Sequence, residues 1–247
     1  MRLSPYPIPE GLEENSAVVG KAPREQHVRT TITAFSAPKF RQIRAALVET
    51  DGPVQVLNLV MFPHLHYDLP IFGADLVSLP GGHLICIDLQ PSALPPPLLA
   101  SSSGGEGAHS SGALPWGGDL PEPARRFFSP HCLWSRPTST ETVETVAFAA
   151  MMDYLRHYLG MAAAAGEVTD PSRLAALLEG HKAYSAYRRV NDPARGMLTR
   201  FYGSDWTERA IETALFDLEM KLREGEYVPL VPAAAPSMVN NEREMDP

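Results

Sequence analysis

Apolar residues recur in short runs over the first part of the chain. The stretch HVRTTITAF, at 27–35, alternates with the period of two that is typical of a half-buried strand. Further strand-like runs lie at 43–48, 54–62, 72–77 and 83–90. Turn residues such as Asp51-Gly52-Pro53 and Pro80-Gly81-Gly82 separate these runs. Consecutive strands on tight turns predict an antiparallel sheet.

Helical signals dominate the second part of the chain, after one more strand-like run at 127–135. Helix starts are indicated at a capping box, Thr138-x-x-Glu141, at Asp170-Pro171, at Asp192-Pro193 and at Ser204. The first predicts a helix over 139–165, the second a helix that runs towards Arg189, and the last two predict shorter helices. Strands followed by helices predict an α+β fold, with an antiparallel sheet and helices packed on its faces.

Two segments differ in composition from the rest. Residues 91–123 are rich in Pro, Gly, Ser and Ala, which predicts a long loop insert outside the core. Residues 227–247 have the composition of a disordered tail. We therefore expect a single domain over 1–226, without internal repeats.

The composition is ordinary for a globular protein of 247 residues, with 44% hydrophobic and 20% charged residues. No apolar run approaches the roughly 20 residues that span a bilayer, and the N-terminus lacks the pattern of a secretory signal. The two cysteines, Cys86 and Cys132, predict buried thiols in a reducing compartment rather than a disulfide framework.

The formal net charge of −8 argues against a general nucleic-acid binder. Local basic clusters are nevertheless present. One contains Lys39, Arg41 and Arg44, and a second contains Arg188, Arg189, Arg195 and Arg200.

Common cofactor and nucleophile motifs are absent. The sequence has no GxGxxG, no Walker loop and no GxSxG motif, so nothing predicts a bound nucleotide or a serine nucleophile. His64-x-His66 lacks a convincing partner cluster, and the cysteines form no CxxC motif, so we predict no metal. The candidate chemistry therefore rests on carboxylates.

Asp75 is the first candidate, because it interrupts the apolar run at 72–77. Its carboxylate either points to a solvated face, or sits at a bulge made by Gly73, or faces a pocket whose apolar walls raise its pKa. Asn58 is a second polar residue in an apolar strand. It is either a satisfied core amide or, if the two strands are neighbours, a group that faces the same cavity as Asp75.

Asp192 is the third candidate. An aspartate before proline starts many helices, so capping alone would explain it. The alternative is a role in a site, with Arg188, Arg189 and Arg195 pairing with it or binding a carboxylate ligand. Arg136 follows the last strand and is by default a surface arginine.

Three segments resemble the ferredoxin-dependent bilin reductases, in the order in which that family has them. They are VLNLVMFPHLHYDLPIFGADLVSLPGGHLICIDLQP at 56–91, FFSPHCLWSRP at 127–137 and YRRVNDPARGMLTRFYGSDWTERAIETALFDLE at 187–219. The resemblance covers roughly residues 6–219, and the three segments together are highly specific for the family.

The resemblance implies an oxidoreductase with a three-layer α/β/α sandwich, which holds a linear tetrapyrrole between the sheet and the C-terminal helices. No metal or nucleotide would be bound. Reduced ferredoxin would supply electrons one at a time through bilin radicals, and the protein would supply protons. Asp75 matches the family's central sheet aspartate, and Asp192 matches its second aspartate, on the opposite side of the bilin. Such acids can stay protonated beside an apolar ligand and donate.

Further residues gain roles from the same resemblance. Asn58 falls where the members that make phycocyanobilin carry histidine, which favours members that reduce the A-ring diene. Arg136 matches an arginine that pairs with a bilin propionate, with Arg188 as a weaker candidate and Asn191 as a further substrate contact. Lys39, Arg41 and Arg44 are predicted on electrostatic grounds alone to dock an acidic ferredoxin.

Within this family, the subgroup whose sequence motifs are most similar reduces 15,16-dihydrobiliverdin to phycoerythrobilin in a two-electron step. The alternatives are members that make phycourobilin or phytochromobilin from biliverdin IXα, a non-catalytic bilin carrier, and an interaction protein that kept only the fold. Possible partners are an upstream bilin reductase and a downstream bilin lyase. We expect a plastid location for an algal protein and a cytoplasmic one for a cyanobacterial protein. Relatives usually carry an N-terminal helix before the strand region, whereas this sequence begins only a few residues before PYPIPEG, so we expect either that the sequence is truncated or that the helix is dispensable.

Overall fold

A computed structural model describes residues 2–92, 114–120 and 122–225 of the chain. Most of the predicted loop at 91–123 and all of the predicted tail at 227–247 lie outside these residues. None of the described helices is long and apolar enough to cross a membrane.

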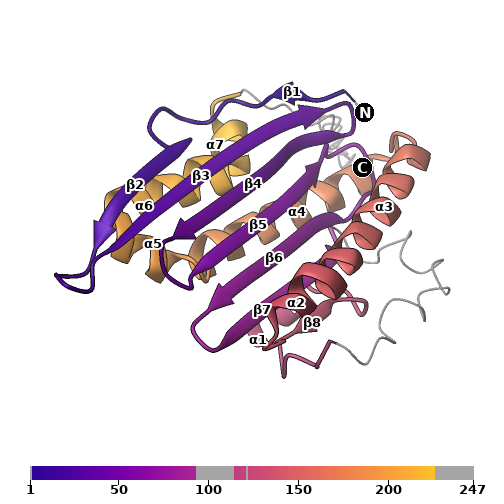
Figure 1. The fold of residues 1–247 in the computed structure, drawn as a ribbon. Coiled ribbons are helices and arrows are strands. Elements are labelled where there is room, and N and C mark those ends of the chain that lie inside the picture. The colour runs from indigo at the N-terminus through magenta and orange to yellow at the C-terminus, as the bar shows by residue number, and fades with distance from the viewer. Residues whose placement is uncertain (1, 93–113, 121, 226–247) are drawn as a thin grey trace, which may run out of the picture.

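The strands form one antiparallel sheet (Figure 1). They are β1 (Ser4–Pro5), β2 (Glu14–Val19), β3 (Gln26–Ala37), β4 (Phe40–Thr50), β5 (Gln55–Pro63), β6 (Ile71–Leu79), β7 (Gly82–Gln90) and β8 (Leu133–Ser135). The order is β1-β3-β4-β5-β6-β7-β8, with β2 also paired to β3. The five strands predicted between residues 27 and 90 are confirmed. The short strands β1 and β2 were not predicted, and the strand expected at 127–135 is confined to β8.

Helical segments make up most of the rest of the described chain. They are α1 (Glu122–Arg125), α2 (Thr140–Thr142), the π-helical turn η2 (Val143–Ala147), α3 (Phe148–Ala164), α4 (Pro171–Asn191), α5 (Arg195–Tyr202), α6 (Ser204–Ala210), the π-helical turn η3 (Ile211–Leu215) and α7 (Leu218–Arg223). The segments α2, η2 and α3 follow one another without a break and occupy the range of the helix predicted at 139–165.

Two of the predicted helix caps are wrong. The hydroxyl of Ser139, rather than that of Thr138, accepts the cap hydrogen bond, which comes from the backbone N–H of Thr142. Gly203 precedes α6, and its positive φ of 84° is accessible to glycine at little cost, so that Ser204 is already helical. The cap at Asp170 is as predicted, because its carboxylate accepts from the N–H of Ser172.

The helices cover the sheet from both sides, so the predicted three-layer sandwich is confirmed (Figure 1). Helix α3 lies on one face over β6 and β7. Its Tyr158 is fully buried, and the Tyr158 ring packs 5.6 Å from both Phe40 and Phe72. The Tyr158 hydroxyl donates to the carbonyl of Pro70 at 2.6 Å, which satisfies its polar atom.

The opposite face packs against α4, α6 and the segment that follows α6. Here Phe62 of the sheet contacts Tyr184 of α4 and Phe216, with ring centroids 6.1 and 6.5 Å apart. These residues belong to one buried apolar cluster with Ile211 and Leu215. Because successive strand residues point to opposite faces, each strand contributes to both cores.

A buried ion pair joins the sheet to the last helix. Arg41 Nη1 lies 2.7 Å from Asp217 Oδ1, and the two side chains are only 3% and 1% exposed. The hydroxyl of Tyr6 donates to the other carboxylate oxygen of Asp217 at 2.5 Å. The N-terminal segment, β4 and the start of α7 are thus tied together by polar contacts inside the core.

The described end of the predicted loop does not lie outside the core as expected. Leu114 packs against the apolar cluster under α3, and Trp116 forms an isolated bridge with Ser135. The last residues of the predicted loop also belong to the short helix α1. Apolar residues dispersed among Pro and Gly therefore return this segment to the edge of the sheet.

Asp88 of β7 is a buried carboxylate that accepts several hydrogen bonds. Its Oδ2 accepts from the backbone N–H of Ser129 at 2.7 Å, and its Oδ1 accepts from the N–H of Leu89 at 2.9 Å and from the Ser129 hydroxyl. Burial raises the pKa of Asp88 to about 6, although the Ser129 hydrogen bonds act in the opposite direction.

The raised pKa predicts a pH dependence of stability. The folded state binds a proton more tightly than the unfolded state, so this stabilisation is lost as the pH rises through the folded pKa. Asp88 should lower the free energy of unfolding by about 1 kcal/mol between pH 5 and pH 7. Urea titrations at both values should show this loss in the wild type and its absence in Asp88→Asn. An equal change in the free energy of unfolding between pH 5 and pH 7 in the two proteins would contradict the prediction.

Candidate active site

A cavity of about 490 Å³ lies between the sheet and the helical layer formed by α4, α5 and α6. The sheet lines it through residues two apart on each strand, as its pleat requires. These pairs are Thr30 and Ile32, Ala46 and Val48, Val56 and Asn58, Asp75 and Val77, and Leu84 and Cys86. Most of this wall is apolar, and the two polar groups near its centre are Asn58 and Asp75.

Strand parity explains why Asp75 stands in an apolar run. Its neighbour Ala74 is fully buried in the core under α3, and Leu76 packs on the same side. Asp75 points the opposite way and lines the cavity. The pairing of β6 with both neighbouring strands is regular through Gly73, so the alternative of a bulge at this glycine is wrong.

Asn58 and Asp75 are direct partners on adjacent strands. The side-chain amide of Asn58 donates from Nδ2 to Asp75 Oδ1. Arg44, which is fully buried on β4, donates from Nη1 to Asn58 Oδ1 at 2.5 Å. Burial raises the pKa of Asp75 above its ordinary value, while the nearby charge of Arg188 and the Asn58 hydrogen bond act against this shift.

Asp192 lines the cavity from the helical side, at the end of α4. Its Oδ1 accepts from the backbone N–H of Ala194 at 2.9 Å, so it stabilises the turn into α5, although that helix begins at Arg195 with Ala194 as its N-cap, two residues after the predicted start. Its Oδ2 lies 3.6 Å from Nη2 of Arg188, one turn earlier, and its side chain is only 7% exposed. The sheet and the helical layer thus each present one carboxylate to the same cavity.

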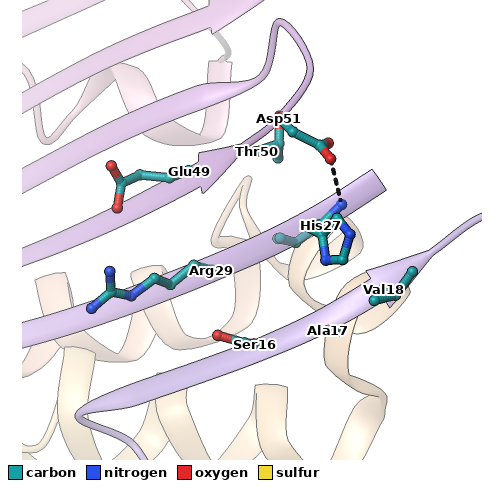
Figure 2. Close-up of a pocket in the computed structure, with 9 residues that line it drawn as sticks. Ser16, Ala17, Val18, His27, Arg29, Glu49, Thr50 and Asp51 are labelled. Carbon is teal, nitrogen blue, oxygen red and sulfur yellow. Dashed lines mark hydrogen bonds between the residues drawn. The ribbon is translucent and has the colours of Figure 1, made fainter. Parts of the chain in front are cut away.

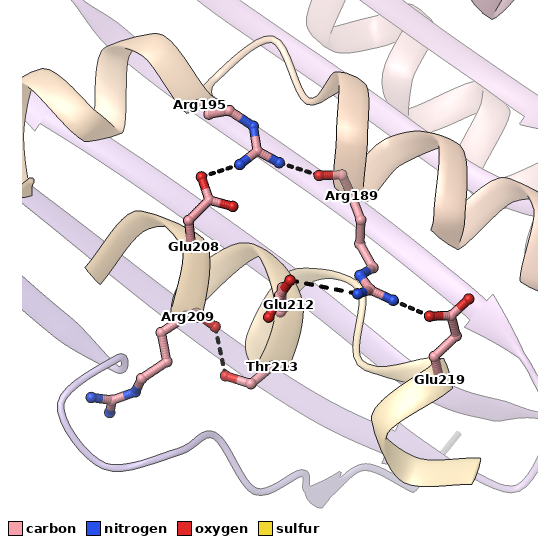
Figure 3. A network of polar contacts seen from close by, with 7 residues as sticks. All are labelled: Arg189, Arg195, Glu208, Arg209, Glu212, Thr213 and Glu219. Carbon is pink, nitrogen blue, oxygen red and sulfur yellow. Dashed lines mark hydrogen bonds and ion pairs between the residues drawn. The ribbon is translucent and has the colours of Figure 1, made fainter. Parts of the chain in front are cut away.

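A polar network on α4 to α7 holds the segment that carries Asp192 (Figure 3). Arg189 pairs with Glu212 and Glu219, and Arg195 pairs with Glu208 and donates to the backbone carbonyl of Arg189. These two arginines therefore contact glutamates rather than Asp192. They fix the end of α4 and the start of α5, between which Asp192 lies.

The three residues predicted to contact the substrate differ in their position relative to the cavity. Arg188 and Asn191 line the cavity beside Asp192. Arg136 is exposed, its Nε donates to the carbonyl of Gly117 at 3.0 Å, and its guanidinium lies over the ring of Trp134, which is itself a lining residue. The structure therefore brings Arg188 and Asn191 together with both aspartates and leaves Arg136 outside the cavity lining.

The predicted basic docking patch requires correction. Arg41 is buried in its ion pair with Asp217, and Arg44 is buried behind Asn58, so neither can present a charge to a partner surface. Lys39 is half-buried and donates from Nζ to the carbonyls of Ala163 and Ala165 at the end of α3. In the sequence, PKFRQIR resembles a surface cluster because its partners lie far away along the chain.

Several lining residues were not predicted. Tyr187, Ala194 and Leu198 share one wall with Asn191, at intervals of three or four residues. This helical spacing was visible in the sequence, but the Asp-Pro start at 192–193 divided it between two predicted helices. Cys86 of β7 is the cross-strand neighbour of Asp75 and lines the same wall of the cavity. Its sulfur lies 3.9 Å from the sulfur of Cys132, and both cysteines are free thiols.

A second hollow, of about 530 Å³, lies over β2, β3 and β4 (Figure 2). It is open to solvent and lined by strand residues that include Arg29, Glu49 and Asp51. These three side chains are exposed. Asp51 accepts from the backbone N–H of His27 at 3.1 Å, which joins the turn after β4 to the start of β3. The residues that line this second hollow include no buried titratable group. We therefore regard the cavity with Asp75 and Asp192 as the candidate active site.

The described residues contain no cluster of three or more potential metal ligands among His, Cys, Asp and Glu. His64 and His66 stack on each other with ring centroids 5.4 Å apart. Burial lowers the pKa of His64 to about 4, and the neighbouring His66 acts in the same direction. The polar groups that line the cavity include the carboxylates of Asp75 and Asp192, the amides of Asn58 and Asn191 and the guanidinium of Arg188, set among mostly apolar walls.

Comparison with known proteins identifies the family. The sequence model of the ferredoxin-dependent bilin reductases matches residues 1–217. The chain is 51% identical over 230 residues to phycoerythrobilin:ferredoxin oxidoreductase of Nostoc punctiforme, covering 89% of this chain and 88% of that protein. It is also 51% identical over 226 residues to the protein of that name from Gloeobacter violaceus, covering 90% of each.

A solved structure is similar as well. The crystal structure of phytochromobilin synthase from tomato in complex with biliverdin matches with a TM-score of 0.73 and 29% sequence identity, covering 87% of this chain and 77% of that one. The family model spans both carboxylates of the cavity, and the relatives cover most of the chain. The chain therefore belongs to the ferredoxin-dependent bilin reductases and is an oxidoreductase.

Proposed function

We propose that the protein reduces the A-ring diene of 15,16-dihydrobiliverdin to give phycoerythrobilin, with ferredoxin as the electron donor. The observation that carries this proposal is the pair of carboxylates, Asp75 and Asp192, on opposite walls of one mostly apolar cavity. Relatives at 51% identity named phycoerythrobilin:ferredoxin oxidoreductase support the choice of reaction. Family membership supports ferredoxin as the source of electrons.

The reaction adds two electrons and two protons to the bilin. Each electron that arrives from ferredoxin produces a bilin radical or anion, which a positioned acid then protonates. Asp75 suits this role because its raised pKa keeps a larger fraction of it protonated near neutral pH. Asp192 would serve the opposite face of a planar ligand, with Arg188 balancing its charge when it has given up its proton.

Two arginines are candidates for binding a propionate of the bilin, and they differ in their position relative to the cavity. Arg188 lines the cavity, whereas Arg136 lies outside it and already donates to Gly117. A charge-assisted hydrogen bond to a carboxylate contributes about 1.5–3 kcal/mol, so Arg188→Gln should weaken bilin binding by about tenfold or more. Fluorescence or absorbance titration with biliverdin measures this, and Arg136→Gln is the matched comparison. A larger loss in Arg136→Gln would reverse the assignment.

An anaerobic turnover assay with reduced ferredoxin tests the proposed function. Biliverdin IXα and 15,16-dihydrobiliverdin are offered separately, and products are identified by absorbance and chromatography. Conversion of dihydrobiliverdin alone to phycoerythrobilin is the expected result. Conversion of biliverdin instead, which the likeness to tomato phytochromobilin synthase makes the main alternative, would overturn the proposed substrate. Binding of both bilins without turnover would indicate a carrier.

A further inference from the structure

Arg44 is a buried cation whose guanidinium lies over the ring of Phe216, 5.6 Å from its centroid, and makes few polar contacts. Its side chain lies on β4 at 0% exposure, and burial lowers the pKa of its guanidinium to about 10. Among the described residues, its Nε and Nη2 atoms have no hydrogen-bond partner, while Nη1 donates to Asn58 Oδ1 at 2.5 Å. Burying a guanidinium with so few partners is unfavourable for folding. The hydrogen bond from its Nη1 leads to Asn58 in the wall of the candidate active site.

Three neighbouring strands carry a chain of hydrogen bonds to the candidate acid. Arg44 of β4 donates to Asn58 of β5, and Asn58 donates in turn to Asp75 of β6. A side-chain amide has one accepting end and one donating end, and either can face a given neighbour. A guanidinium carries donors alone, so Arg44 can only pair with the oxygen end of Asn58. The NH₂ end is then directed at Asp75.

We propose that Arg44 is a positioning residue, which fixes the orientation of the Asn58 amide so that Asn58 always donates to Asp75 and leaves the second carboxyl oxygen of Asp75 to carry the proton that the bilin receives. This inference rests on the proposed function, in which Asp75 is a proton donor. Arg44 itself does not line the cavity and would touch neither the bilin nor the proton.

The orientation of the amide has a chemical consequence. An NH₂ group facing the carboxyl group stabilises the carboxylate that remains after proton transfer, so it strengthens Asp75 as an acid. If the amide turned round, its oxygen would face Asp75 and could pair only with the protonated form. The proton would then be held between Asp75 and Asn58 and directed away from the cavity.

The first test does not depend on turnover. In ¹⁵N-labelled, ligand-free protein, the Asn58 side-chain amide should show one strongly downfield proton with slow exchange, because it donates to Asp75. This signal should be lost in Arg44→Met and retained in Arg44→Lys, which keeps a charged group that can only donate. Its absence from the wild type would overturn the proposal even if no variant folds. Its persistence in Arg44→Met would overturn it as well.

The second test is the pH profile of kcat. Asp75 is active when protonated, so activity falls on the alkaline side as its pKa is passed. Arg44→Met should raise the midpoint of this alkaline limb by about one pH unit and lower its plateau by about tenfold. Arg44→Lys should leave the midpoint close to that of the wild type. A lower plateau with an unchanged midpoint would indicate a structural role alone and would overturn the proposal.

A double-mutant cycle shows whether Arg44 acts through Asn58. Other groups that interact with Asp75 are Cys86 from β7 and Tyr184, Arg188 and Asp192 from the α4 side, and all of them stay in place in these variants. In an Asn58→Leu background, Arg44→Met should move the midpoint by less than a third as much as in the wild type. An equal shift in both backgrounds would mean that the Arg44 charge acts directly on Asp75. If the wild type reduces no bilin, the proposed function fails, and the amide signal still decides the orientation.

Discussion

Asp75→Asn and Asp192→Asn should each lower kcat for bilin reduction by about 100- to 10,000-fold, the usual contribution of a positioned general acid. Asparagine has nearly the shape of aspartate but cannot supply a proton. Both residues line the cavity, from opposite walls, so neither loss is readily covered by the other. Affinity for the bilin should change little, because the apolar walls and Arg188 remain.

Asp88→Asn is the matched control for these variants. Asp88 is also a buried sheet aspartate with a raised pKa, but it does not line the cavity. Stopped-flow absorbance under anaerobic conditions, with reduced ferredoxin in excess, would compare all three variants with the wild type. We expect Asp88→Asn to retain turnover within about threefold, well below the effect of losing a general acid. Turnover of the wild-type order in both cavity variants would contradict the assigned roles.

The largest expected effect on stability comes from the buried pair of Arg41 and Asp217. Arg41→Met would leave the Asp217 carboxylate buried with the Tyr6 hydroxyl as its remaining partner among the contacts described. Breaking one side of a buried ion pair costs about 3–5 kcal/mol, because the charge that remains has lost its compensation. Urea unfolding followed by circular dichroism measures this loss as a lower midpoint.

Two comparisons test whether burial is the cause of this loss. Arg41→Met with Asp217→Leu removes both charges and should recover most of the lost stability, since an apolar pair of similar volume is often as stable as a buried ion pair. The exposed pair of Arg29 and Glu14 is the surface control, and Arg29→Met should leave the midpoint unchanged within error. Additive losses in the double variant would contradict the explanation.

The sheet could be read from the sequence because its strands bury alternate residues on two different cores. Asp75 stood out for a different reason, because it interrupts the apolar run at 72–77. Strand β2 could not be predicted, because its short sequence, ENSAVV, alternates between exposed and half-buried residues while its apolar residues stand together at one end. Pairing with β3 rather than local preference forms it.

The site was predictable where chemistry is local and unpredictable where it depends on distant partners. Asp75 and Asp192 followed from motifs and from the family resemblance. The burial of Arg41 depends on Asp217, and that of Arg44 depends on the way three strands align, so a basic run in the sequence was mistaken for a surface patch. The roles of Arg136 and Lys39 remain predictions.

The division of the cavity between two layers has a consequence for the order of events during synthesis. The wall with Asp75 is made by strands that leave the ribosome early, whereas the wall with Asp192 belongs to helices near the C-terminus. The strands β3 to β7 pair with their neighbours in sequence, so they can assemble while the chain is still growing. Until α4 and α5 arrive, the apolar face around Asn58 and Asp75 has no cover. Nascent chains stalled before α4 should therefore contain a formed sheet with an exposed apolar face. Binding of the bilin should begin only when translation is nearly complete.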